Sequence, residues 1–176
     1  GMGRGVGMGG GMGAMMETVN GWLGDRVFVS GVHRPARTVE RRAYRLRVLN
    51  GSNARIYKLA WSDGTPFTIL GGDGGLLERA RIRRFLTLAP GQRADVLLDF
   101  SGRAAGTDVQ LESLAFPADA VGRVGMMDQA PPLPQGAPLS LMTLRVAGGT
   151  GPRLRLPEQL CEPPAEPLVH QIAKAL

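Results

Sequence analysis

The stretch from Tyr44 to Phe100 constrains the fold more than any other part of the chain. It contains the segments YRLRVLNGSNARIYKLAW, DGTPFTILGGDGGLL and LTLAPGQRADVLLDF, in which apolar and polar residues alternate between turns of Gly, Asn, Asp and Pro. Alternation with a period of two residues is typical of β-strands that bury one face. Several such strands separated by short turns predict a Greek-key β-sandwich.

The same alternation continues on both sides of this stretch and predicts an all-β fold of about seven or eight strands. We expect strands near Val27–Val29 and over Arg41–Asn50, Arg55–Trp61, Pro66–Leu70, Arg84–Leu88, Arg93–Phe100, Thr107–Leu114 and Ser140–Val146. Apolar residues at alternate positions define the face of each strand that we expect to be buried. The two clearest faces are Tyr57, Leu59 and Trp61, and Ala94, Val96, Leu98 and Phe100.

Turn chemistry adds local expectations. The segment Asn50–Asn53 combines residue types that tolerate positive φ. Asp63-Gly64 predicts a β-hairpin, because a type I′ turn needs positive φ at both central residues. In the segment APGQ, proline presets φ and Gly91 accepts the left-handed conformation. Asp73, within GGDGG, is expected to cap its own turn through a side-chain hydrogen bond.

The net charge of +6 and the pI of about 10.6 raise the question of nucleic-acid binding. Nearly all the positive charge is arginine scattered over strands and turns, aromatic residues make up only 5% of the chain, and no zinc-finger spacing is present. The densest basic segment holds Arg79, Arg81, Arg83 and Arg84. We expect it to be a solvated or interdomain edge, and we expect no nucleic-acid partner.

Composition also divides the chain into three parts. Residues 1–22 are rich in Gly and Met and are expected to form an interdomain linker, residues 23–148 to form one domain, and residues 149–176 to form a Pro-rich linker. No run approaches the ~18 apolar residues that a membrane-spanning helix needs. The single cysteine, Cys161, has no partner for an internal disulfide and is expected to be an incidental thiol.

Four segments in series carry a resemblance to one protein family. GDRVFVSG, YRLRVLNGSNARIYKL, GGDGGLL and LAPGQRADVLLDF resemble, in order and spacing, the middle cupredoxin domain of the multicopper oxidases, which are laccase-like enzymes. Where the family usually has Asn-Gly at the end of the first segment, this chain has Ser30-Gly31. The later PLSLMTLRV and LPEQL resemble the closing strand and the start of the following linker. The motif residues are Asn50, Gly51, Arg55, Asp73, Gly74, Gly91, Arg93 and Asp95.

The resemblance implies a copper-free scaffold domain of a copper-dependent oxidoreductase. In the family, two outer domains hold copper through His-X-His motifs and a blue-copper set of two His, a Cys and often an axial Met. This chain has no His-X-His motif, and its only histidines are His33 and His170. We therefore expect no catalytic residue, no confident metal ligand and no cofactor in the chain itself, with copper in the full-length parent.

The same resemblance sets expectations for the whole parent. It would oxidise phenols, amines or metal ions and reduce dioxygen to water, and the present chain alone would be inactive. Its partners would be the first and third cupredoxin domains of the same parent chain, in a periplasmic or secreted compartment, and apolar surface would be exposed where those domains dock. The alternative is a domain of a copper-less protein of this fold that serves in cell division or envelope assembly and has no enzymatic activity.

One metal site remains open from the residues alone. Met8, Met12, Met15 and Met16 are separated by glycine-rich spacers, and thioethers are soft ligands that favour Cu(I). Met2 belongs to the same set, and Met126-Met127 could join it or fill a cleft. A simple linker whose methionines bind nothing is the competing interpretation. For Arg93 and Asp95, we expect pairing with charges or backbone across the sheet instead of catalysis.

Overall fold

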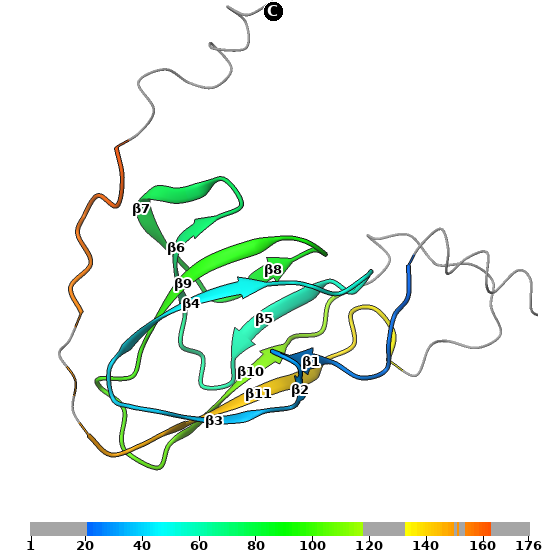
Figure 1. Ribbon diagram of the computed structural model, residues 1–176, viewed down its shortest axis with the longest axis horizontal. Coiled ribbons are helices and arrows are strands. Elements are labelled where there is room, and N and C mark those ends of the chain that lie inside the picture. Colours follow the sequence, from blue (N-terminus) through cyan, green and yellow to red (C-terminus); the bar gives the residue numbers. More distant parts are fainter. Residues whose placement is uncertain (1–20, 118–132, 150, 152–153, 163–176) are drawn as a thin grey trace, which may run out of the picture.

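A computed structural model describes residues 21–117, 133–149, 151 and 154–162 of the chain (Figure 1). These residues form eleven β-strands and no helix. The strands are β1 (Phe28–Val29), β2 (Val32–His33), β3 (Ala36–Val39), β4 (Ala43–Leu49), β5 (Tyr57–Trp61), β6 (Phe67–Gly72), β7 (Gly75–Arg83), β8 (Leu86–Leu88), β9 (Arg93–Asp99), β10 (Asp108–Ser113) and β11 (Leu139–Val146). The predicted all-β fold class is confirmed.

Two sheets make up the body of the domain and a short ribbon accompanies them. The larger sheet has the order β3-β11-β10-β5-β8, the smaller has the order β4-β9-β6-β7, and β1 pairs only with β2. All pairs are antiparallel except β3 with β11, which run parallel. Strands adjacent in the sequence therefore lie in different sheets at several points, which gives the sandwich its crossed connections (Figure 1).

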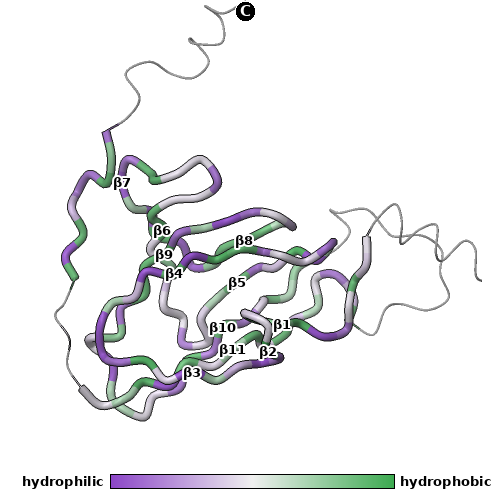
Figure 2. The backbone as a smooth tube through the Cα atoms, viewed as in Figure 1, coloured by the Kyte–Doolittle hydropathy of each residue, from purple (hydrophilic) through white to green (hydrophobic). Residues whose placement is uncertain are grey.

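The core lies between the two sheets and takes residues from both. Val96 on β9 and Val109 on β10 are fully buried, and the rings of Trp61 on β5 and Phe67 on β6 lie 5.6 Å apart across the interface. Figure 2 shows hydrophobic residues alternating with hydrophilic ones along these strands. The faces predicted from alternation are confirmed, since all seven residues are buried: Tyr57, Leu59, Trp61, Ala94, Val96, Leu98 and Phe100.

Three of the strands were not expected from the sequence. Strand β2 has two residues and β3 has four, so neither contains enough alternation to be recognised. Strand β7 has nine residues, GLLERARIR, but it lies at the edge of the smaller sheet and is mostly exposed. An edge strand needs no continuous apolar face, and charged residues are common there. The strand count therefore exceeds the expected seven or eight.

The hairpin predicted at Asp63-Gly64 is wrong. Strand β5 pairs with β8 and β10, whereas β6 pairs with β7 and β9, so the chain crosses from one sheet to the other at this turn. Only Gly64 has positive φ, 75°, and its N–H donates to the carbonyl of Trp61. The type I′ geometry occurs instead at Ser30 and Gly31, with φ of 50° and 80°, between the paired strands β1 and β2.

Candidate functional site

Asn50 is a buried polar residue at the end of β4, and its side chain joins three parts of the chain. Its Nδ2 atom donates to the carbonyl oxygens of Arg55, at 2.7 Å, and Leu88, at 2.9 Å, while its Oδ1 accepts from the N–H of Ser52 at 3.0 Å. Its backbone N–H donates to the carbonyl of Gln92. The residue types of the segment Asn50–Asn53 tolerate positive φ, but none of these residues has it. The turn is held by side-chain hydrogen bonds instead.

Arg55 is also buried, with 4% of its surface exposed, and it lies just before β5 in the chain. Its guanidinium donates to three carbonyl oxygens, those of Gly24, Leu133 and Pro134, at 2.7 to 3.1 Å. Burial lowers the pKa of the Arg55 guanidinium from its ordinary value. The residue therefore fastens two distant segments to the start of β5, which is a structural role.

Arg93 and Asp95, both on β9, pair across the smaller sheet as expected. Asp95 forms an ion pair with Arg45 on β4, and a side-chain hydrogen bond from Arg45 lowers the pKa of the Asp95 carboxyl. Arg93 pairs with Asp73 through its Nε, at 3.1 Å. The expectation that Asp73 caps its own turn is wrong, because its Oδ1 accepts from the backbone N–H and the side chain of Arg93. Asp73 therefore anchors the β6–β7 turn to the start of β9.

The glycines of the motif differ in how far their positions require glycine. Gly91 has φ of 80° in the turn that Gln92 closes with a hydrogen bond to Ala89, as expected. Gly51 and Gly74 do not have positive φ, and a Cβ at either would meet no atom within 4 Å. Gly71, which lies outside the motif list but begins the segment GGDGGLL, also requires glycine, because an added Cβ would overlap the carbonyl oxygen of Gly75.

Nothing in the sequence indicated an ion pair at the turn between β5 and β6. Arg103 pairs with Asp63, and its Nη2 donates to the Oγ1 of Thr65 at 2.5 Å. Its guanidinium also lies over the ring of Phe100, 5.3 Å from the centroid. Desolvation raises the pKa of Asp63, but hydrogen bonds from Arg103 and Thr65 outweigh it, so the pKa lies below its ordinary value. No sequence signal links residues that are 40 positions apart.

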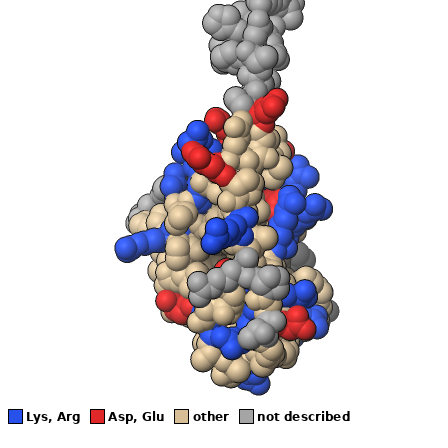
Figure 3. All heavy atoms as spheres, turned by 90° about the vertical axis from the view of Figure 1, so that its left-hand side faces the viewer, with Lys and Arg blue, Asp and Glu red and all other residues tan. Residues whose placement is uncertain are grey.

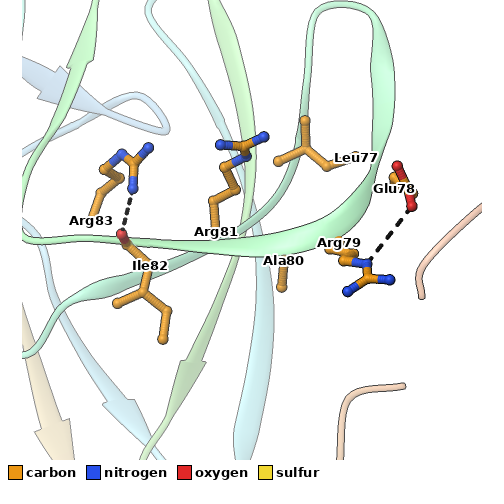
Figure 4. A pocket seen from close by; sticks show the side chains of 7 residues that line it. All are labelled: Leu77, Glu78, Arg79, Ala80, Arg81, Ile82 and Arg83. Atoms are coloured by element: carbon orange, nitrogen blue, oxygen red, sulfur yellow. Dashed lines mark hydrogen bonds and ion pairs between the residues drawn. The ribbon is translucent and has the colours of Figure 1, made fainter. Parts of the chain in front are cut away.

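Strand β7 carries the basic segment recognised in the sequence. Arg79, Arg81 and Arg83 lie on this edge strand and are exposed, which agrees with the expected basic edge. A hollow of about 410 Å³ is lined by residues 77–83 (Figure 4). Figure 3 shows basic side chains in several places over this side of the molecule, with fewer acidic ones between them. The arrangement offers charge and backbone groups but no catalytic combination of residues.

The comparisons with known proteins agree with this geometry. No protein-family model matches the chain. The chain is 51% identical over 81 residues to the cell division protein FtsP of Xenorhabdus nematophila, and 41% identical over 83 residues to the laccase of Bacillus subtilis. Its structure matches that of a variant of the McoA multicopper oxidase of Aquifex aeolicus with a TM-score of 0.70 and 31% identity.

The chain is a cupredoxin-like relative of the multicopper oxidases. The matches cover only part of each relative. They take in 46% of this chain and 17% of the FtsP sequence, 47% of this chain and 16% of the laccase, and 84% of this chain and 31% of the McoA chain. The chain thus spans less than a third of the length of the relatives that it matches.

The residues present do not fit a copper centre of the multicopper oxidase type. A trinuclear cluster needs paired His-X-His motifs, which the chain lacks, and a blue-copper set needs a cysteine and two histidines gathered at one place. His33 lies on β2, with its Nδ1 3.0 Å from the carbonyl oxygen of Val27, and the Sγ of Cys161 contacts the carbonyl oxygen of Leu76 at 3.5 Å. Among the described residues, no three His, Cys, Asp or Glu side chains gather as metal ligands would.

Several of the predicted candidates lie outside the described residues. These are Met2, Met8, Met12, Met15 and Met16, together with Met126, Met127 and His170. Within the part of the chain that the structure describes, no helix is long and apolar enough to cross a membrane.

Proposed function

We propose that this chain is the copper-free middle domain of a three-domain multicopper oxidase and that it acts as a scaffold for two copper-binding cupredoxin domains. The observation that carries the proposal is the combination of a fold match and a missing ligand set. The chain matches an oxidase structure at a TM-score of 0.70 over 31% of that chain, while its sequence has no His-X-His motif and its described residues gather no set of metal ligands.

In this proposal, the full-length parent oxidises phenols, amines or metal ions and reduces dioxygen to water, and the present chain alone is inactive. The parent is exported to the periplasm or secreted, in keeping with the compartments typical of the family. The apolar side chains exposed on the domain supply its contacts with the neighbouring domains. Trp22, Phe28 on β1 and Val32 on β2 are exposed apolar side chains of this kind, and Phe28 and His33 pack with ring centroids 5.8 Å apart.

The same domain suits a second function, supported by a separate observation. Identity to the cell division protein FtsP, 51% over 81 residues, exceeds identity to the laccase, 41% over 83 residues. The alternative parent is therefore a cell-division or envelope protein of this fold without enzymatic activity. A scaffold domain holds no copper in either case, so the domain itself is compatible with both.

The sequence that flanks this chain in its gene separates the two proposals. His-X-His motifs and a Cys with neighbouring histidines on both sides would support the oxidase, and the full-length protein should then bind copper, show a blue absorption band and consume dioxygen with a phenolic substrate. Flanking cupredoxin domains that lack these ligands, in a full-length protein that retains no copper after loading, would refute the oxidase and favour the FtsP-like parent. Flanking regions without cupredoxin domains would refute the scaffold role altogether.

A further inference from the structure

The middle of strand β7 is not fully paired within its own sheet. In the register of β6 and β7, Ile69 pairs with Arg81 and Gly71 pairs with Leu76, which leaves residues 77–80 without partners in β6. These residues continue a strand at the open edge of the smaller sheet (Figure 1). Backbone groups at such an edge need hydrogen-bond partners and provide a template for an added strand.

A later segment of the same chain already contacts one end of this edge. The segment containing Glu158, Leu160 and Cys161 lies against β7: the N–H of Leu160 donates to the carbonyl of Glu78 at 2.7 Å, and the carboxylate of Glu158 contacts the Nη1 of Arg79 at 3.3 Å. One extended segment can therefore donate a backbone hydrogen bond to a carbonyl of β7 and also pair an acidic side chain with a neighbouring arginine of the strand. These contacts use only one end of the strand.

The rest of β7 also carries exposed arginine side chains along the open edge. Arg81 and Arg83 project to one side of the strand together with Leu77, while Ile82 projects to the other (Figure 4). The Nη1 of Arg83 is bonded to the carbonyl oxygen of Ile82, at 2.9 Å, and neither Arg81 nor Arg83 forms an ion pair with any described carboxylate. The hollow of about 410 Å³ along residues 77–83 gives an added segment room beside these guanidinium groups.

An apolar hollow adjoins the basic one. It measures about 250 Å³ and lies between the β6–β7 turn and the strands β8 and β9. Leu77 lines both hollows, and Ile69, Leu86 and Ala94 line the second. An extended segment presents alternate side chains to opposite sides, so one with alternating acidic and apolar residues would place its carboxylates on the side of Arg81 and Arg83 and its apolar side chains on the side of the exposed Ile82.

We propose that the β7 edge binds an extended acidic segment of a partner protein, which adds as a strand beside residues 80–83, the part of the edge that the segment around Leu160 does not contact. Backbone hydrogen bonds align the segment, Arg81 and Arg83 pair with its carboxylates on one side, and its apolar side chains pack against the exposed Ile82 on the other side. This partner is distinct from the copper-binding domains of the proposed scaffold role, and its binding needs no copper.

Fluorescence anisotropy on the full 176-residue chain tests the proposal. The probe is a labelled peptide of about five residues, long enough to cover residues 80–83, in which Glu and Val alternate. We expect saturable binding that weakens as salt is raised, and loss of binding for the counterpart with Lys in place of Glu. Equal binding of the two peptides, or no binding of either, would overturn the proposal.

Charge reversal locates the site. The double variant Arg81→Glu, Arg83→Glu is expected to weaken binding by about tenfold or more. The matched control is Arg26→Glu, Arg37→Glu, which changes the net charge equally at two exposed positions away from β7. Circular dichroism checks that both variants are folded. Equal weakening by the two double variants would indicate general attraction to a basic protein and would overturn the proposed site.

Backbone methylation of the peptide separates strand addition from charge attraction. Two peptides carry N-methyl groups on alternate residues, in opposite registers, with all side chains unchanged. Only one register can block the hydrogen bonds that face β7, so we expect one peptide to lose binding by about tenfold and the other to retain it. Equal affinities for both would refute strand addition, as would about tenfold tighter binding of a single-stranded oligonucleotide of the same net charge, which would indicate a nucleic-acid site.

Discussion

The side-chain amide of Asn50 donates a hydrogen bond of 2.9 Å to the carbonyl oxygen of Leu88, and this contact joins the two sheets of the sandwich. Asn50 follows β4 in the smaller sheet, and Leu88 ends β8 in the larger one. The same amide bonds the carbonyl of Arg55, just before β5. One buried side chain therefore fixes how the end of one sheet sits on the other.

Removing this amide should destabilise the domain. Asn50→Ala leaves two carbonyl oxygens, those of Arg55 and Leu88, without their donor in a buried position. We expect the free energy of unfolding to fall by roughly 2–4 kcal/mol, since each buried group that loses its partner costs about 1–3 kcal/mol. Urea denaturation measures the change. Asn53→Ala is the control, because the exposed Asn53 side chain accepts, among the described residues, only from the N–H of Trp22, and its removal should cost about 1 kcal/mol or less.

The pair of Asp63 and Arg103 should make stability depend on pH in acid. The pKa of Asp63 lies below its ordinary value of 3.8, so the folded protein keeps this carboxylate ionised to lower pH than the unfolded chain does. The contribution is then complete above about pH 4 and is lost as the pH falls through the folded pKa. Asp63→Asn should lower the free energy of unfolding by roughly 1–3 kcal/mol near neutral pH.

The same variant should flatten the loss of stability below about pH 4, because the carboxylate is no longer present to be protonated. Urea unfolding at a series of pH values measures both effects. Arg103→Met should reproduce the loss at neutral pH. If Asp63→Asn unfolds with an acid dependence equal to that of the unaltered protein, the pair does not govern this region of pH.

Gly71 should not tolerate a larger residue. A Cβ at this buried position of β6 would overlap the carbonyl oxygen of Gly75, across the irregular register of β6 and β7. Gly71→Ala is therefore expected to lower the free energy of unfolding by roughly 1–3 kcal/mol through overpacking. Gly74→Ala is the matched control: no atom lies within 4 Å of its added Cβ, so its effect should stay within about 0.5 kcal/mol. Thermal and urea denaturation of both variants check the difference.

The methionines near the start of the chain remain a proposal for a Cu(I) site. If Met8, Met12, Met15 and Met16 bind the ion, the chain loaded under reducing conditions should retain colourless copper through gel filtration. Changing Met12, Met15 and Met16 to Leu should remove that copper, whereas Met142→Leu on β11 should not. Copper content by atomic absorption measures the outcome, and equal retention by all variants would exclude this site.

The buried faces of the strands followed from the sequence because they depend on local alternation. Residues Ala94, Val96 and Leu98 point to one side of β9 whichever strands lie beside it, so a period of two residues is sufficient. The ion pair of Asp95 with Arg45 was foreseen only as pairing across the sheet, because the partner of β9 was not defined. The resemblance to the multicopper oxidases likewise rested on turn-flanked strands whose order is a property of the chain.

Which strands pair was decided by tertiary structure. At Asp63-Gly64, the dipeptide is typical of a hairpin, but β5 and β6 enter different sheets because their apolar faces must meet across the core, where Trp61 contacts Phe67. The ion pair of Asp63 with Arg103 then holds the turn at which the chain crosses between the sheets. The sequence by itself determined eight of the eleven strand segments, the buried faces of the clearest ones and the lack of His-X-His motifs. The packing of two sheets determined the crossed connections, the role of Asn50 and the open edge at β7, because these depend on contacts between residues that are distant in the chain.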